Sequence, residues 1–410
     1  MDDKQNSTGD SPNEGEGNKT AAHQYNEAQR RFAQSGKVEE KAREAEKAID
    51  GPEKEALQQA AAVAKRHSAD PAVEKGAKTK LGLVLGGGAA VLAAAGLINH
   101  ALARRAERRN PPEGKFVTVD GVRLHYIESG TGPAIVLLHG NGTMARDFVL
   151  SGVFDLLCKD HRVIAFDRPG FGFSDRPRGR IWTPDAQACL FQKSLQRLDV
   201  QRAVVVGHSW GTLVAVALAL RDQPTVAGLV LLSGYYFPSV RADVALMSWP
   251  AMPLLGDILR YTISPLLGRL MAPAAHRKMF APSPVSERFA KEFPVELEMR
   301  PSQIRASAGE AALMIPGAAG LAKHHSELSL PVAIMAGRGD KIVDCDSQAG
   351  RLGTELPGST LTKVPGAGHM IHHIVPEQVA AVIRDLVRAA TVVGEANTAA
   401  DGKKLPIAPE

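Results

Sequence analysis

Cysteine is scarce in this sequence. The 410 residues contain only three, Cys158, Cys189 and Cys345, and these lie far apart. Such spacing excludes a disulfide framework and a cysteine-rich metal site, so we expect free thiols, which favour a reducing compartment.

A strong charge imbalance is also missing. The net charge is +5 and the isoelectric point is about 9.0. No run of residues concentrates this excess into the basic footprint of a nucleic-acid-binding protein, so we expect no nucleic-acid partner. With 44% hydrophobic and 23% charged residues, the composition is that of an ordinary globular enzyme. A chain of this length can hold one large domain with appendages.

Residues 1–80 are poor in aromatic side chains, with only Tyr25 and Phe32, and are rich in Glu, Lys, Gln and Ala. This composition predicts a polar tether that is largely disordered or loosely helical. Residues 37–49 have the charge pattern of a solvated helix, for which a partner-binding helix is the alternative. No apolar run follows the first residue, so we expect no signal peptide there.

Residues 81–103 contain no Asp, Glu, Lys or Arg over 23 positions, a length that can span a bilayer. We predict a single-pass membrane anchor; because Ala and Gly dominate, a buried or amphipathic helix is the alternative. Gly82 and Gly86 form a small-xxx-small pattern, which predicts that two such helices pair into a homodimer. The triple glycine at 86–88 lacks the Gly-Lys-Ser/Thr that a phosphate loop requires. Basic residues flank both ends, so the orientation of the anchor stays open: Lys75, Lys78, Lys80, Arg104, Arg105, Arg108 and Arg109.

After about residue 112 the sequence changes to short apolar runs that alternate with helix-like segments. This alternation predicts an α/β fold with a mostly parallel, doubly wound sheet over residues 112–390 and a disordered tail at 391–410. A hairpin around the Asp-Gly at 120–121 precedes the parallel strands. Between 234 and about 328 the alternation stops, and a stretch rich in Met, Pro and Leu predicts a helical insertion. The expected parallel strands are 134–138, 162–166, 203–207, 228–233 and 331–337.

GHSWG at 207–211 is the motif that carries the chemistry. Ser209 stands at the carboxyl end of the apolar run 203–207, and a helix is expected directly afterwards. Strand, sharp turn and helix are the context of a nucleophile elbow, in which small residues such as Gly207 and Gly211 leave room for a strained turn. We therefore predict that Ser209 is a nucleophile.

A serine nucleophile needs a base and an acid that orients the base. His369 lies in the Gly-rich segment GAGH, and Asp340 follows the strand at 331–337. The order Ser209, Asp340, His369 is that of a triad whose acid and base stand on loops after strands. The alternatives for the base are His372 and His373, and those for the acid are Asp344 and Asp346, which are better placed in the first turns of helices.

The oxyanion that forms during acyl transfer needs backbone N–H donors. Trp210 offers one at the start of the helix after the elbow. HGNG at 139–142 directly follows a strand, and we assign the N–H of Asn141 as the second donor. We interpret His139 as a structural side chain that packs the turn.

These motifs resemble those of the α/β-hydrolase superfamily. The matching segments, in order, are HGNG (139–142), DRPGFGFSDRP (167–177), GHSWG (207–211), GRGD (337–340) and GAGH (366–369). The chain is similar to the branch that includes cofactor-free haloperoxidases, epoxide hydrolases, haloalkane dehalogenases and carbon–carbon bond hydrolases. The resemblance implies an eight-stranded sheet, a helical cap over the active site at about 234–328, and structural roles for Asp167 and Ser174.

The departures from the family pattern narrow the function that the resemblance implies. Dehalogenases and epoxide hydrolases of this branch use an aspartate nucleophile, whereas this sequence has Ser209. Haloperoxidase-like members commonly carry an aromatic residue where Asn141 stands. Carbon–carbon bond hydrolases share the triad but have a longer loop after the HG.

The predicted cap contains two apolar patterns. Leucines and isoleucines at helical spacing predict one buried helix face on either side of Pro265, formed by Leu255, Ile258, Leu259, Leu266, Leu267 and Leu270. Candidates for an apolar substrate pocket are Tyr235, Tyr236, Met247, Trp249 and Met252. His324 and His325 lack further residues with ligand spacing, so we expect no metal.

We therefore expect a membrane-tethered serine hydrolase that cleaves a hydrophobic carboxylic ester with no metal or organic cofactor. Two alternatives remain open. One is a carbon–carbon bond hydrolase with the same triad, and the other is a catalytically silent scaffold that binds partners through residues 1–80.

Overall fold

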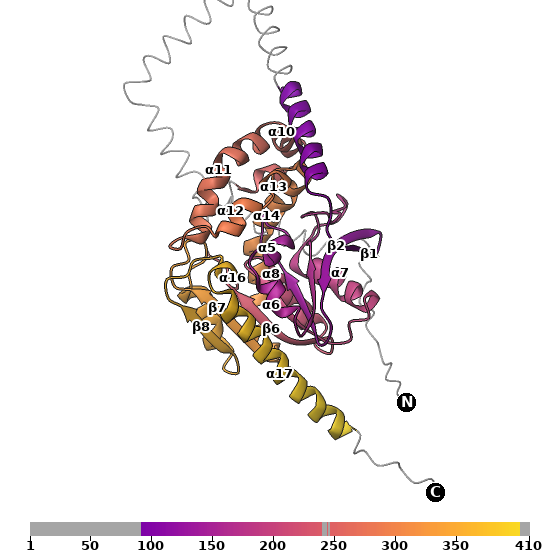
Figure 1. The fold of residues 1–410 in the computed structure, drawn as a ribbon, viewed down its shortest axis with the longest axis vertical. Helices are drawn as coiled ribbons and strands as arrows, with labels where there is room; N and C mark the ends of the chain where they lie inside the picture. The colour runs from indigo at the N-terminus through magenta and orange to yellow at the C-terminus, as the bar shows by residue number, and fades with distance from the viewer. Residues whose placement is uncertain (1–91, 240–243, 245–246, 402–410) are drawn as a thin grey trace, which may run out of the picture. The chain divides into compact units, whose positions relative to one another are not determined.

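The computed structural model describes residues 92–239, 244 and 247–401, with side chains up to residue 391. The described residues belong to one compact unit (Figure 1). The predictions for residues 1–80, and for the part of the expected anchor before residue 92, lie outside the described residues.

An eight-stranded sheet with the order β1-β2-β4-β3-β5-β6-β7-β8 forms the centre of this unit. β1 and β2 form an antiparallel hairpin, β2 also pairs antiparallel with β4, and every other pairing is parallel. The predicted α/β-hydrolase fold with a mostly parallel sheet is confirmed. The strands are β1 (Lys115–Val119), β2 (Val122–Ser129), β3 (Ala134–Leu138), β4 (Arg162–Phe166), β5 (Ala203–His208), β6 (Val226–Leu232), β7 (Val332–Gly337) and β8 (Thr360–Val364).

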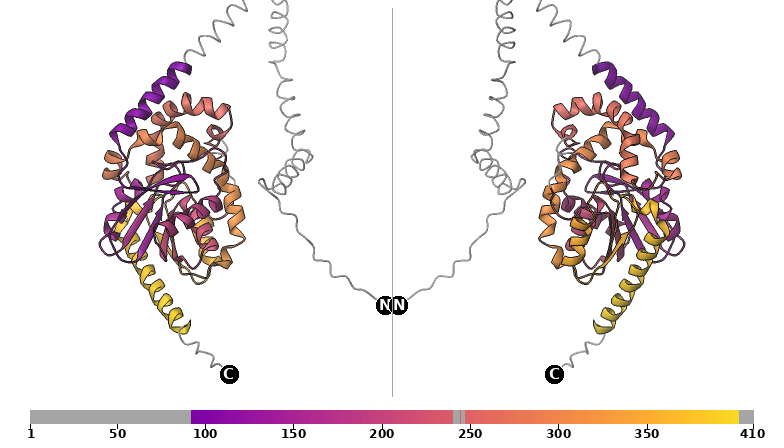
Figure 2. Two further views of the ribbon diagram at one scale, coloured as in Figure 1. Left: turned by 90° about the vertical axis from the view of Figure 1, so that its right-hand side faces the viewer. Right: turned by 90° about the vertical axis from the view of Figure 1, so that its left-hand side faces the viewer.

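The central strands are apolar throughout because helices cover both faces of the sheet (Figure 2). On β5, Val205 packs into one hydrophobic core, whereas Val204 and Val206 pack into a second core on the opposite face. The first core contains α7 (Pro184–Arg197) and α8 (Gly211–Arg221), and the second contains α5 (Arg146–Leu150), α6 (Val153–Leu157) and α17 (Pro376–Asp401).

A helical cap joins β6 to β7 (Figure 1). Its elements are η1 (Trp249–Ala251), α10 (Leu255–Tyr261), α11 (Ile263–Phe280), α12 (Glu287–Glu292), α13 (Val295–Glu298), α14 (Pro301–Ala322) and η2 (His325–Glu327). Two short elements, η3 (Asp346–Gly350) and α15 (Arg351–Glu355), lie between β7 and β8, and α16 (Ile371–Ile374) follows β8.

The apolar face predicted around Pro265 is not buried, which corrects the sequence expectation. Leu255, Ile258, Leu266 and Leu267 are about half exposed, and Leu270 is 79% exposed. Helical spacing identifies an apolar face but not what covers it. The buried residues of α11 are Pro265, Ala272 and Phe280, whereas the large apolar side chains between Ile263 and Met271 are exposed.

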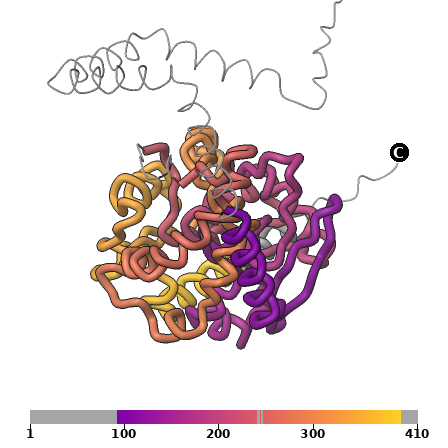
Figure 3. The backbone as a smooth tube through the Cα atoms, turned by 90° about the horizontal axis from the view of Figure 1, so that it is seen from above, coloured from indigo at the N-terminus to yellow at the C-terminus, as the bar shows by residue number. Residues whose placement is uncertain are grey.

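A helix over residues 92–109 lies beside the cap (Figure 3). Buried Asn99 donates from Nδ2 to the carbonyl oxygens of Tyr261 and Thr262, at 3.0 and 2.7 Å, where α10 meets α11. Among the described residues, no helix combines the length and the apolar character needed to cross a bilayer.

The C-terminal helix is longer than expected. The sequence predicts a tail from residue 391, but α17 continues to Asp401, so that boundary falls inside the helix. The extra residues, 391–401, contain no Pro, and Gly394 is their only Gly. Three of them are Ala, a residue that favours a helix. Residues 402–410 lie outside the described residues.

Candidate active site

Ser209 sits on a sharp turn between β5 and α8. Its φ of +53° is a left-handed conformation that non-glycine residues rarely adopt. The neighbouring glycines make the turn feasible. A Cβ on Gly211 would stand 2.2 Å from the carbonyl oxygen of Leu138, and one on Gly207 would stand 2.7 Å from the carbonyl oxygen of Gly211. The turn therefore has the geometry of a nucleophile elbow.

The structure brings Ser209, His369 and Asp340 into one hydrogen-bonded chain. The Oγ of Ser209 lies 2.9 Å from Nε2 of His369, and Nδ1 of the same imidazole lies 2.7 Å from Oδ2 of Asp340. Ser209 is partly exposed, whereas the side chains of His369 and Asp340 are 4% and 1% exposed. The serine can therefore meet a substrate while the base and acid are shielded from water.

Two loops position the acid and the base. Asp340 follows β7, and its Oδ1 accepts hydrogen bonds from the backbone N–H groups of Ile342 and Val343, at 2.7 and 2.9 Å. His369 follows β8, and its backbone N–H donates to the carbonyl oxygen of Met279 on α11 at 3.1 Å. Backbone N–H groups thus hold the carboxylate of Asp340, and the bond to α11 fixes the backbone from which the imidazole of His369 extends.

The expected oxyanion donors lie next to the elbow. Trp210 stands at the N-cap of α8, before the first intrahelical hydrogen bond, where backbone N–H groups have no helical partner. A Cβ on Gly140 would lie 3.1 Å from the Cβ of Ser209, which places the segment that contains Asn141 beside the nucleophile. The cap helix α14 holds this segment, because Asn141 donates from Nδ2 to the carbonyl oxygen of Ser307 at 3.1 Å.

A buried ion pair that the sequence analysis missed connects this segment to the cap. Arg168 donates to the carbonyl oxygens of His139 and Gly140, at 2.7 and 2.9 Å, and forms a two-pronged pair with Glu310 of α14. Both charged side chains are 0% exposed. Glu310 also accepts from Gln187, and its backbone oxygen accepts from the indole of Trp210. Arg168 lies within the DRPG motif, which was the only sequence signal for it.

His372 and His373, the alternatives for the base, do not contact the serine. Their Nε2 atoms lie 2.9 and 2.8 Å from the two carboxylate oxygens of Asp147, which the sequence analysis also missed. Asp147, His208 and His372 are the described residues whose ligand atoms could converge on a metal, within 4.8 Å of one another. Both oxygens of Asp147 accept from the imidazoles of His372 and His373, and Nε2 of His208 lies 3.0 Å from the carbonyl oxygen of His369, so the cluster packs directly against the base of the triad.

The alternatives for the acid have other partners too. Asp344 accepts a hydrogen bond from the backbone N–H of Ser347 at 2.8 Å, at the start of η3. Asp346 forms an ion pair with Lys363 on β8. Both carboxylates therefore serve the local structure.

Burial keeps several histidines around the site neutral. It lowers the pKa of His139 to about 3, helped by the charge of Arg168. Burial next to His372 and His369 lowers the pKa of His208 well below its usual range. Burial alone would raise the pKa of Asp147, but the two adjacent imidazoles hold it well below its usual range.

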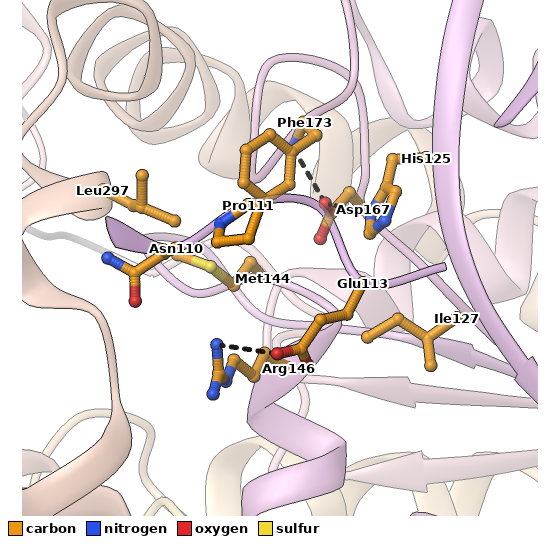
Figure 4. A pocket seen from close by; sticks show the side chains of 10 residues that line it. All are labelled: Asn110, Pro111, Glu113, His125, Ile127, Met144, Arg146, Asp167, Phe173 and Leu297. Carbon is orange, nitrogen blue, oxygen red and sulfur yellow. Dashed lines mark hydrogen bonds and ion pairs between the residues drawn. The ribbon is translucent and has the colours of Figure 1, made fainter. Parts of the chain in front are cut away.

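Asp167 and Ser174 hold the loop after β4. Asp167 accepts hydrogen bonds from His125 at 2.7 Å and from the backbone N–H of Phe173 at 2.8 Å, and Ser174 donates to its carbonyl oxygen at 2.6 Å. A small cavity of about 20 Å³ is lined in part by Asp167 and His125, and none of its lining residues belongs to the triad (Figure 4). These contacts agree with the structural reading of the motif.

The five candidate pocket residues differ in burial, and the expectation that they line one substrate pocket stays a prediction. Tyr235 and Tyr236 are 2% and 1% exposed and belong to the hydrophobic core under the cap. Met247, Trp249 and Met252 of the cap are about half exposed. All five side chains are largely apolar, so the sequence alone could not distinguish the members that face the core from those that are exposed.

Comparisons with known proteins identify the family of the chain. A profile described as alpha/beta hydrolase fold matches residues 133–374. The chain is 28% identical over 288 residues to haloalkane dehalogenase 2 of Mycobacterium tuberculosis, a match that covers 67% of this chain and 94% of that protein. It is 32% identical over 201 residues to a 2-hydroxymuconate semialdehyde hydrolase of a Pseudomonas species, covering 46% of this chain and 69% of that protein.

Solved structures share the fold. A meta-cleavage product hydrolase from Pseudomonas fluorescens superposes with a TM-score of 0.55 and 23% identity, covering 68% of this chain and all of that one. The chain therefore belongs to the α/β-hydrolase fold family, and its fold and relatives support a hydrolase.

Proposed function

We propose that the protein is a serine hydrolase that cleaves carboxylic esters. The observation that carries the proposal is the position of His369, whose two ring nitrogens lie 2.9 Å from Ser209 Oγ and 2.7 Å from Asp340 Oδ2. An imidazole held in this way can take a proton from the hydroxyl while the carboxylate stabilises the resulting imidazolium.

The reaction follows from these contacts. Ser209 Oγ attacks the ester carbonyl carbon as its proton passes to Nε2 of His369. The N–H groups of Trp210 and Asn141 stabilise the oxyanion, and His369 returns the proton to the departing alcohol oxygen. Water then attacks the acyl-enzyme, giving its proton to His369, and the acid is released as Ser209 regains its proton.

Steady-state hydrolysis of p-nitrophenyl esters of increasing acyl length tests the proposal. We expect turnover that rises with acyl length in the wild-type chain, because the substrate is proposed to be hydrophobic. Ser209→Ala should lose activity by at least about 10⁴-fold, since it removes the nucleophile. Equal activity in both chains would mean that another group performs the hydrolysis.

Cleavage of a carbon–carbon bond is the second candidate. It is favoured by the 32% identity to the 2-hydroxymuconate semialdehyde hydrolase, which extends over less than half of this chain. Activity on a vinylogous diketone, with none on simple esters, would support this candidate against the first.

Dehalogenation is not proposed despite the dehalogenase relative. Attack of Ser209 on an alkyl halide would leave an alkyl ether, which has no carbonyl carbon for water to attack. An aspartate nucleophile avoids this because its intermediate is an ester. Ser209 therefore suits acyl transfer better than halide displacement.

A further inference from the structure

The outer face of α11 is apolar but points away from the protein. Ile263, Leu266, Leu267, Leu270 and Met271 follow the spacing of one helix face, and each is about half exposed or more. Two further large apolar side chains of the cap, Ile258 of α10 and Trp249 of η1, are each 52% exposed. A group of large apolar side chains this extensive marks an interaction surface.

The helix over 92–109 leads an apolar segment to this surface. Asn99 ties it to the junction of α10 and α11 through two buried hydrogen bonds, and Arg269 of α11 donates to Asn99 Oδ1 at 3.1 Å. Leu97 and Ile98 are 72% and 55% exposed beside this junction. The preceding residues 81–91 carry no charge, so the chain enters the helix from a continuous apolar segment.

Basic side chains follow the apolar part of the helix. Arg104, Arg105, Arg108 and Arg109 are exposed. At 1.5 Å per residue, Arg104 lies about 10 Å along the helix axis from Leu97, so the charged side chains follow the apolar first turns rather than being mixed with them. Arg277 and Lys278 stand in the last turn of α11, after its apolar face.

We propose that the outer face of α10 and α11, with the first turns of the helix 92–109, docks in one leaflet of a lipid bilayer. The apolar side chains contact acyl chains, and the arginines contact anionic headgroups. A bilayer fits better than a protein groove because basic residues, which pair with anionic headgroups, follow the exposed apolar side chains both on the helix 92–109 and on α11. The cap thus lies in the membrane interface rather than across the membrane.

Native tryptophan fluorescence tests this docking in the full chain. Of the three tryptophans, Trp182 and Trp210 are buried, and Trp249 is exposed on the cap. The chain is reconstituted into vesicles of phosphatidylcholine and phosphatidylglycerol, with or without bromine atoms on the acyl chains. We expect brominated lipid to quench part of the emission and Trp249→Phe to abolish that quenching, because only Trp249 can reach the lipid.

Charged variants locate the docking surface. The double variant Leu266→Glu with Leu270→Glu should lose the bromine-dependent quenching, since it places charges in the apolar face. Leu361→Glu, at an exposed leucine on the edge strand β8, should keep it. Near-ultraviolet circular dichroism shows whether each variant is folded.

Three results would overturn the proposal. One is the absence of bromine-dependent quenching in the folded wild-type chain. Another is unchanged quenching in the double variant, which would show that the outer face of α11 does not contact the lipid. The third is protection of Trp249 from aqueous acrylamide at rising protein concentration without lipid, which would assign the surface to a second copy of the chain.

Docking has a consequence for the substrate that rests on the proposed function. The double variant should hydrolyse a soluble short-chain ester at the wild-type rate but should lose rate on a long-chain ester embedded in vesicles. Loss on both substrates would point to a damaged active site, whereas absence of hydrolysis in the wild-type chain would count against the ester proposal and leave the quenching result intact.

Discussion

Gly211 leaves room for the sharp turn at Ser209 because it has no side chain. The residue begins α8 directly beneath β3, and its missing side chain lets the helix approach the carbonyl oxygens of Leu138 and His139. Since those oxygens lie where β3 leads into the oxyanion segment, any shift of Gly211 moves the nucleophile and the segment relative to each other.

Gly211→Ala should therefore destabilise the protein and reduce turnover. The new Cβ would stand 2.2 Å from a backbone oxygen, so backbone must move, at a cost of about 1–3 kcal/mol in the free energy of unfolding. Gly320→Ala on α14 is the matched control, because no atom lies within 4 Å of its Cβ position, and alanine should stabilise that helix by about 0.5–1 kcal/mol. Urea titrations measure both; equal effects of the two changes would contradict the packing argument.

Among the elements, the cap helix α14 does more than cover the site. Through Glu310 and Arg168 it determines where the carbonyl oxygens of His139 and Gly140 point, and so where the following N–H groups can point. The cap and the oxyanion segment are therefore one structural unit.

Arg168→Met should cost about 3–5 kcal/mol in stability, because buried Glu310 would lose its two hydrogen bonds from Arg168 and keep only Arg176, at 3.9 Å, as a charged partner. Adding Glu310→Leu should recover part of that stability, since it removes the buried carboxylate but also takes a partner from Arg176. Turnover should stay low in the double variant because the two carbonyl oxygens still lack Arg168. Recovery of both stability and kcat would mean that Arg168 does not position the segment.

The strands and the triad could be predicted from the sequence for a physical reason. Buried parallel strands are uniformly apolar, and loops at their carboxyl ends meet at one edge of the sheet, so Ser209, Asp340 and His369 were expected together. The partners of Asp147 could not be predicted, because His372 and His373 lie more than 200 residues away. Nor could the exposure of Leu270, since an apolar helix face looks the same whether protein or lipid covers it.

At the scale of the whole molecule, buried neutral histidines couple stability to pH. His139 accepts a hydrogen bond from the backbone N–H of Arg168 at Nε2, and its Nδ1 lies 2.7 Å from the carbonyl oxygen of Gly140, which together require the neutral ring. Its pKa is about 3 when folded and about 6.5 when unfolded. Burial lowers the pKa of His208 and His372 as well.

The free energy of unfolding should therefore fall as the pH drops below about 6.5. Above this pH both states are neutral and the full stability is present. Below it the unfolded chain gains protons that the folded chain does not, at about 1.4 kcal/mol per pH unit for each such histidine until its folded pKa is reached. Urea titrations between pH 7.5 and 4.5 measure the slope, and a flat profile would contradict the buried neutral state.

Labelling with a fluorophosphonate tests most directly whether Ser209 is an activated nucleophile. The wild-type chain and Ser209→Ala are treated side by side, and the modified peptide is mapped by mass spectrometry. The account predicts one phosphonylated residue, Ser209, in the wild-type chain and none in the variant. A folded wild-type chain that stays unlabelled, or a label on another residue, would contradict it.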